Sequence, residues 1–277
     1  MKSLRQVKDL IRNRAKEDNV NAQVLLRNYM LGRLLERISL SEYKNKFILK
    51  GGMLVMAMVG ENKRSTIDMD VTAKHFPVNL ESIEAALKTI LAVDVGDGVY
   101  MEVSKIEQTR ADDEYDGFRI SLNAFLENAK VPIKVDITTG DKITPKEISY
   151  KYELLLEDRN INVLSYNLET VIAEKLETII TRSTANTRMR DYYDIYILLN
   201  VHGDQLDRES LADALNETAE HRGTTHVLLE GKEILLEIFQ SSELLNHWTR
   251  YQKKYNYADE ISWNQINITI TSLWNSL

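Results

Sequence analysis

The segment from Thr66 to Val71 alternates apolar with polar side chains, which is the pattern of a half-buried β-strand. This alternation places Asp68 and Asp70 on the same face, opposite the apolar residues. Cα atoms two residues apart on a strand are separated by about 6.5 Å, so the two carboxylates can converge on one or two divalent cations. Oxygen ligands favour Mg²⁺ or Mn²⁺. The alternative is that both acids only form the solvated face of an edge strand.

A third acid lies further along the chain, in one of three strands expected at about 99–107, 117–123 and 130–138. Apolar residues alternate through the last of these strands and leave Lys134 and Asp136 on the opposite face. Asp136 is therefore a candidate third metal ligand, or the group that orients or deprotonates an acceptor hydroxyl. A surface aspartate without a role is the alternative.

Before these acids, the apolar run F-I-L-K-G-G-M-L-V-M-A-M-V-G is interrupted by Lys50, Gly51 and Gly52 and is expected to continue as a buried helix. Adjacent glycines at the start of a helix can direct backbone N–H groups at phosphate oxygens, so Lys50, Gly51 and Gly52 are candidate nucleotide-binding residues. A simple turn into the helix is the alternative. The spacing is not that of a P-loop.

Helical periodicity predicts helices over residues 22–38 and 79–92, and later from Val171 to Arg182. Ser3 and Gln6 form a candidate capping box, and Asn79 is a candidate N-cap. From about residue 165 onward the pattern is helical, with aromatic residues expected in the core. We therefore expect an α+β protein with two domains, residues 1–164 and 165–277.

Composition excludes several classes of protein. The chain has no cysteine, which rules out disulfides, thiolate zinc sites and cysteine nucleophiles. No apolar stretch approaches the roughly 20 residues that span a bilayer, and the N-terminus has no signal-peptide core, so we expect a cytoplasmic protein. The net charge of −7 argues against nonspecific coating of nucleic acid. A local basic groove remains possible around Lys175, Arg182, Arg188 and Arg190.

Four ordered motifs, L-K-G-G-M-L, R-S-T-I-D-M-D, Y-N-L-E-T-V-I-A-E-K-L-E and N-T-R-M-R-D-Y-Y-D-I-Y, resemble the AbiEii/AbiGii family of nucleotidyltransferase toxins. These proteins belong to abortive-infection and type IV toxin–antitoxin systems. The resemblance runs from about Asn28 to Asn200. It implies a DNA-polymerase-β-like catalytic fold, metal-dependent transfer of a nucleotide to an acceptor, and control by an AbiEi-like antitoxin.

The resemblance also implies roles for individual residues. Lys175 matches a lysine expected to bind nucleotide phosphate, and Asp191 matches an active-site acid that organises Lys175 or the acceptor. Arg64 and Thr66 match basic and hydroxyl positions expected to contact phosphate. Asp194 is expected to be structural, in an internal salt bridge to Arg188 or Arg190.

Together these features predict transfer of NMP from an NTP, with Mg²⁺ or Mn²⁺, and the resemblance alone implies that the acceptor is an RNA. The tRNA 3′ end is the acceptor that the resemblance favours. Carboxylates and two cations serve hydrolysis equally well, so a metal-dependent phosphohydrolase or nuclease is an alternative. A non-catalytic NTP-binding module is a second one.

Overall fold

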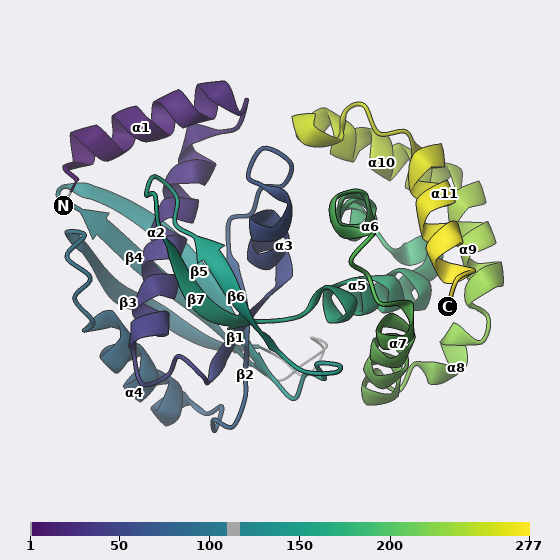
Figure 1. The fold of residues 1–277 in the computed structure, drawn as a ribbon, viewed down its shortest axis with the longest axis horizontal. Helices are drawn as coiled ribbons and strands as arrows, with labels where there is room; N and C mark the ends of the chain where they lie inside the picture. Colours follow the sequence, from purple (N-terminus) through teal and green to yellow (C-terminus); the bar gives the residue numbers. More distant parts are fainter. Residues whose placement is uncertain (1, 110–116) are drawn as a thin grey trace. The chain divides into compact units, whose positions relative to one another are not determined.

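In the computed structural model, which describes residues 2–109 and 117–277, the chain divides into two units. The first contains residues 1–141 and 147–166, and the second contains residues 142–146 and 167–277. The domain boundary was expected after residue 164. The first unit ends two residues later, at Tyr166, and all residues from Asn167 onward belong to the second unit. A mixed sheet with flanking helices, followed by a helical region, confirms the α+β class (Figure 1).

The first unit is built on a seven-stranded sheet of order β3-β4-β5-β2-β1-β7-β6. β2 pairs in parallel with β5, and β1 pairs in parallel with β7, whereas the remaining neighbours are antiparallel. The strands are β1 (Phe47–Lys50), β2 (Met69–Ala73), β3 (Val99–Thr109), β4 (Gly117–Leu126), β5 (Ala129–Thr139), β6 (Ile148–Glu153) and β7 (Asn160–Ser165); the helices of this unit are α1 (Leu4–Glu17), α2 (Ala22–Leu40), α3 (Gly51–Val59) and α4 (Leu80–Leu91).

Alternating side chains give the sheet one apolar face and one polar face. Ile120 and Leu122 of β4 and Ile133 and Val135 of β5 are buried, and α2 packs against β5. Burial of these side chains is the main driving force for this packing. The polar residues between them, including Asp136, point to the other face. The predicted strands at 99–107, 117–123 and 130–138 are confirmed.

The predicted helix ends are also confirmed. Ser3 and Gln6 form the capping box of α1, and the Asn79 side chain accepts a hydrogen bond from the Ser82 backbone at the start of α4. Each cap satisfies backbone N–H groups that the first helical turn leaves without partners.

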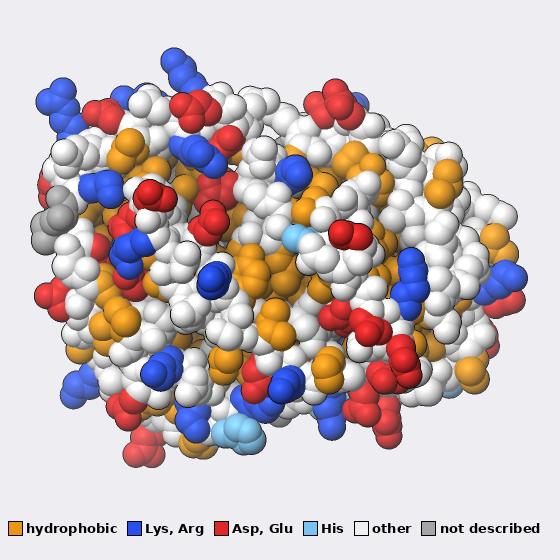
Figure 2. Space-filling view, in the orientation of Figure 1, with side chains coloured by type: hydrophobic (Ala, Val, Ile, Leu, Met, Phe, Trp, Pro, Cys, Tyr) orange, Lys and Arg blue, Asp and Glu red, His pale blue; other side chains and the backbone are white. Residues whose placement is uncertain are grey.

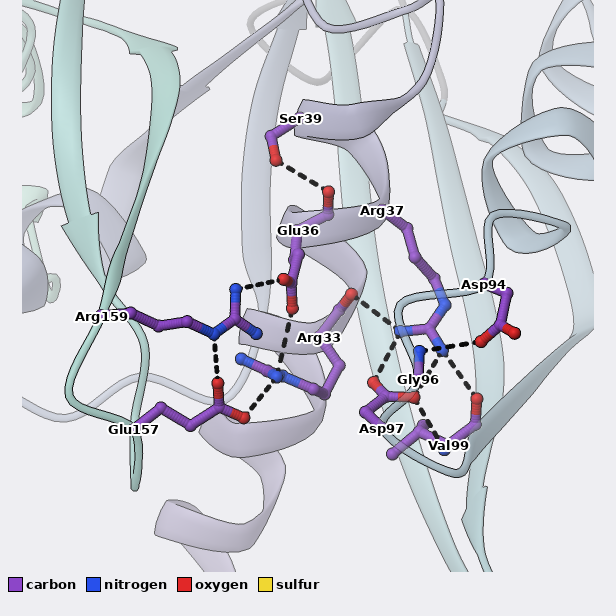
Figure 3. A network of polar contacts seen from close by, with 10 residues as sticks. All are labelled: Arg33, Glu36, Arg37, Ser39, Asp94, Gly96, Asp97, Val99, Glu157 and Arg159. Carbon is purple, nitrogen blue, oxygen red and sulfur yellow. Dashed lines mark hydrogen bonds and ion pairs between the residues drawn. The ribbon is translucent and has the colours of Figure 1, made fainter. Parts of the chain in front are cut away.

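The hairpin of β6 and β7 extends the sheet, and no strand was expected there. Its loop contributes Glu157 and the exposed Arg159 to a charge network with the buried Arg33 and Glu36 of α2 (Figure 3). Arg33 Nη1 lies 2.7 Å from Glu157 Oε1, and Arg159 Nη1 lies 2.5 Å from Glu36 Oε1. Opposite charges compensate each other here, as burial of charge requires. The network fixes the hairpin to α2.

The second unit is helical around an aromatic core. Trp248 is fully buried and donates its indole N–H to the Ile261 carbonyl, and Trp263 packs against Tyr192. This confirms the expected core role of both tryptophans. The helices are α5 (Leu168–Arg182), α6 (Met189–His202), α7 (Arg208–Arg222), α8 (Thr225–Leu228), α9 (Gly231–Gln240), α10 (Ser242–Lys254) and α11 (Trp263–Trp274), with short 3₁₀ turns at Ser183–Ala185 and Asn256–Ala258.

Candidate active site

The strand that carries the first two acids starts later than predicted. β2 begins at Met69, so Asp68 lies just before the strand and Asp70 lies on it. On one side of β2, β1 turns into α3 directly after Lys50, the partner of Asp70, and offers no pairing to earlier residues. The Thr66 hydroxyl instead donates to Asp68 Oδ1 at 3.1 Å, and Ile67, expected to face the core, is 51% exposed.

Four charged residues stand side by side across the sheet. Lys50 of β1 pairs in register with Asp70 of β2, Asp70 with Asp136 of β5, and Asp136 with Arg119 of β4. Residues in register on adjacent strands project to the same face. The row therefore places two acids between two bases, as the strand patterns around Asp70 and Asp136 predicted for the acids alone.

Asp70 is held against the start of α3. The Gly52 N–H donates to Asp70 Oδ2 at 3.4 Å, and Gly51 has a φ of +66°. A Cβ at Gly51 would lie 2.1 Å from Asp70 Oδ2, so only glycine fits. Burial raises the pKa of Asp70, and the neighbouring charge of Asp68 adds to this, against the opposing effect of Lys50. The Gly52 amide, predicted to contact phosphate, is directed at this carboxylate.

Asp136 is bound by a residue that the sequence did not single out. Arg119 Nε and Nη2 donate to the two Asp136 oxygens, each at 2.8 Å. This is the bidentate geometry that guanidinium and carboxylate groups favour. The Arg119 side chain is 49% exposed and that of Asp136 is 21% exposed. The register of the β4–β5 hairpin would have revealed the pair.

Lys50 is engaged within the sheet. Its Nζ lies 3.0 Å from Asp141 Oδ1 and 5.6 Å from the centre of the Tyr166 ring. Burial would raise the pKa of Asp141, but the Lys50 charge and hydrogen bonds from Thr138 and Thr72 outweigh it and lower that pKa. Lys50 was predicted to bind phosphate, and the structure gives it a buried carboxylate as partner.

Gly52, Arg64 and Thr66 lie together beside the acids. A Cβ at Gly52 would meet Thr66 Oγ1 at 2.9 Å and Arg64 Nη2 at 3.5 Å. Arg64 is buried and donates to the Ser65 carbonyl. The predicted phosphate-binding residues of this unit are thus gathered at one end of β2, and their role in phosphate binding stays a prediction.

The donor set suits a hard divalent cation. Asp68, Asp70 and Asp136 offer carboxylate oxygens, and the charges of Asp68 and Asp136 add to the burial that raises the pKa of Asp70. Within residues 2–109 and 117–277, however, no three His, Cys, Asp or Glu side chains form a ready metal site. Both Asp136 oxygens accept hydrogen bonds from Arg119. Asp68, Asp70 and Asp136 are the residues that would hold such a cation.

In the second unit, Lys175 of α5 bridges two acids of α6. Its Nζ lies 3.2 Å from Asp191 Oδ1 and 2.7 Å from Asp194 Oδ2. Asp194 is fully buried, and Arg188 Nε lies 3.8 Å from Asp191 Oδ2. The structure thus brings Lys175 and Asp191 together, as the family resemblance implied. Asp194 was expected to pair with Arg188 or Arg190, which stays a prediction; its carboxylate pairs with Lys175, because α5 packs alongside α6.

The fold is that of the nucleotidyltransferases. The structure is similar to a crystal structure of an H. pylori protein provisionally named a nucleotidyltransferase, with a TM-score of 0.53, 14% identity, and coverage of 92% of this chain and 95% of that one. JHP933 from Helicobacter pylori is similar with a TM-score of 0.51, 14% identity, and coverage of 91% and 90%. At this identity the likeness concerns the fold alone.

The sequence places the chain within a family. Residues 33–266 match the model of the nucleotidyl transferase AbiEii toxin family of type IV toxin–antitoxin systems, and the protein belongs to this family. The resemblance seen in the four motifs is confirmed, and the chain is a toxin-type nucleotidyltransferase. No curated protein matches it in sequence. Among the described residues, no helix has the length and apolar character to cross a membrane.

Proposed function

We propose that the protein transfers NMP from an NTP to the end of an RNA acceptor, with the tRNA 3′ end as that acceptor, and that it depends on Mg²⁺ or Mn²⁺. The observation that supports this best is the adjacency of Asp70 and Asp136, which pair in register on β2 and β5, with Asp68 just before β2. Phosphoryl transfer requires positioning and charge neutralisation more than covalent chemistry. A set of acids on one sheet face fits that requirement.

Each residue has a place in this proposal. Asp68, Asp70 and Asp136 would hold the cations, which when bound neutralise the triphosphate and favour the acceptor oxygen as its anion. Thr66 orients Asp68 through its hydroxyl, and the start of α3 fixes Asp70 through Gly52.

Lys175 would bind nucleotide phosphate, since its ammonium is a compact positive charge with three donors. Asp191 would hold Lys175 in position, as their contact at 3.2 Å supports. Asp194 neutralises the same lysine from its buried position.

The charge distribution bears on the acceptor. On the face drawn in Figure 2, Lys and Arg side chains are interspersed with Asp and Glu, and no broad area of described residues on that face is uniformly basic. Together with the net charge of −7, this favours recognition of a short RNA end over extended binding of the phosphate backbone. Since the family is that of type IV toxins, we further propose an AbiEi-like antitoxin as the regulatory partner.

The test is to incubate the purified protein with Mg²⁺, total RNA and each α-³²P-labelled NTP in turn. We expect label on one RNA band, released pyrophosphate, and loss of both in Asp68→Ala/Asp70→Ala. Asp158→Ala, an exposed acid of the same unit, is the matched control and should retain transfer. Release of phosphate without labelled RNA would instead indicate hydrolysis. NTP binding without any turnover would indicate a binding module.

A further inference from the structure

The row of charges across the sheet is not symmetric. At one end, Lys50 forms an ion pair with Asp141, and the two side chains are 9% and 0% exposed. At the other end, the Arg119 side chain is 49% exposed and forms an ion pair with Asp136 on the neighbouring strand, β5. A buried ion pair is strongly disfavoured from separating, whereas an exposed pair exchanges partners readily because water solvates both groups. Arg119 is therefore the more solvent-accessible of the two cations in the row.

Arg119 also occupies the atoms that a metal ion would need. Both oxygens of Asp136 accept a hydrogen bond at 2.8 Å from the same guanidinium. Mg²⁺ binds carboxylate oxygens at about 2.0–2.1 Å, and a divalent ion at that distance would repel the guanidinium. The two cations thus compete for Asp136.

We propose that Arg119 is the internal counter-ion of Asp136 and that it sets the affinity of the site for divalent cations by competing with them. This rests on the metal-dependent function proposed above. Arg119 acts through Asp136 and is a positioning residue. While the pair is formed, Asp68 and Asp70 remain as the ligands, and release of Arg119 completes the set of three acids.

Lys134 provides a matched control for the charge. It lies on the same face of β5 as Asp136, two residues earlier, and pairs in register with Ser121. Lys134→Gln removes one positive charge close to the acids, as Arg119→Gln does, but leaves the bidentate pair intact.

The experiment is a titration with Mn²⁺ in the absence of nucleotide, in which free Mn²⁺ is measured by electron paramagnetic resonance. Arg119→Gln should bind Mn²⁺ at least about threefold more tightly than the wild type, as expected for loss of an exposed ion pair at the ligand. Lys134→Gln should differ from the wild type by less, and Arg119→Gln/Asp136→Asn should bind no more tightly than Asp136→Asn. Arg119→Lys, which keeps the charge, should stay closer to the wild type than Arg119→Gln does.

Several results would overturn the inference: unchanged or weaker binding in Arg119→Gln, equal tightening in Lys134→Gln, tightening that persists without Asp136, or no Mn²⁺ binding in any variant. Circular dichroism melts confirm that each variant is folded, and Arg119→Met, which also removes the charge, serves if the glutamine variant is not. The RNA-labelling assay is run on the same samples. Tighter Mn²⁺ binding without transfer would contradict only the proposed function, and transfer with unchanged Mn²⁺ affinity would contradict only the role of Arg119.

Discussion

Lys50 Nζ lies 3.0 Å from Asp141 Oδ1, in a pair whose side chains are almost entirely removed from solvent. The lysine stands directly before the two glycines that start α3, where the sequence predicted a phosphate ligand. Asp141 also accepts a hydrogen bond from the Thr138 hydroxyl at 2.6 Å. The ion pair links the ends of β1 and β5, so its main role is to stabilise the sheet.

Lys50→Met is expected to lower the free energy of unfolding by about 3–5 kcal/mol, because it leaves the buried Asp141 carboxylate without its counter-ion. Urea denaturation at pH 7 measures this. The double variant Lys50→Met/Asp141→Leu removes both charges and should recover much of the loss. If Lys50→Met unfolds at the wild-type midpoint but no longer binds NTP, the lysine is a phosphate ligand and not a structural residue.

Asp70→Asn is expected to stabilise the protein at pH 7 in the absence of metal. Burial and the charge of Asp68 raise the pKa of Asp70, so the native state holds this proton more tightly than the unfolded chain does. Wild-type stability therefore falls as the pH rises from the ordinary aspartate value of about 3.9 to the raised native pKa, and is level above it. The gain from Asp70→Asn should vanish below about pH 3.9.

Thermal melts of Asp70→Asn and wild type between pH 3 and 8 check this sign. Asp136→Asn is the control, because Asp136 is paired with Arg119 and its removal should bring no comparable gain. A lower melting temperature for Asp70→Asn at pH 7 would show that the ionised carboxylate is not under strain.

Gly51→Ala is expected to reduce transfer by tenfold or more, because a Cβ would displace the Asp70 carboxylate and misplacement of a reacting group by about 1 Å is costly. Gly96→Ala is a matched control. Gly96 has the same φ of +66° but no heavy atom within 4 Å of an added Cβ, so it reports the backbone cost alone, about 1–2 kcal/mol. Equal activity in both variants would mean that the contact with Asp70 is unimportant.

The two acids bound to Lys175 should separate stability from activity. Asp194→Asn should cost about 3 kcal/mol of unfolding free energy, since Asp194 is fully buried and 2.7 Å from Lys175. Asp191→Asn should lower the unfolding free energy less, because Lys175 keeps its ion pair with Asp194. For the same loss of stability, however, Asp191→Asn should lower the transfer rate more than Asp194→Asn does. Melting temperatures and the RNA-labelling rate are compared for both. Full activity in Asp191→Asn would remove that acid from the site.

Regular, locally encoded elements were predictable from the sequence. Strict alternation of apolar and polar residues predicts β4 and β5, and apolar helical periodicity after the Asn79 cap predicts α4. The start of β2 was not predictable, because alternation continues through Thr66 while pairing stops at Met69. Pairing between β1 and β2 ends at Lys50 and Asp70, and where β1 ends cannot be read from the residues of β2.

In the site, the same distinction holds. Asp70 and Asp136 were placed on the correct faces by period alone, but their cross-strand neighbours depend on register. The partnership of Asp136 with Arg119 follows from a tight hairpin in which Leu126 pairs with Ala129. Its turn uses Glu127 at a φ of +50°, without the glycine that normally marks such turns. The register was therefore hidden.

The strand order also governs when this protein can complete its fold during synthesis. β1 lies between β2 and β7, and Leu49 pairs with Ser165, more than a hundred residues later. Arg33 and Glu36 of α2 likewise form ion pairs with Glu157 and Arg159, which are synthesised much later. A nascent chain that ends before β7 leaves β1 as an open edge, and such late, long-range closure slows folding. A growing polypeptide therefore cannot assemble the finished catalytic sheet until most of its length has left the ribosome.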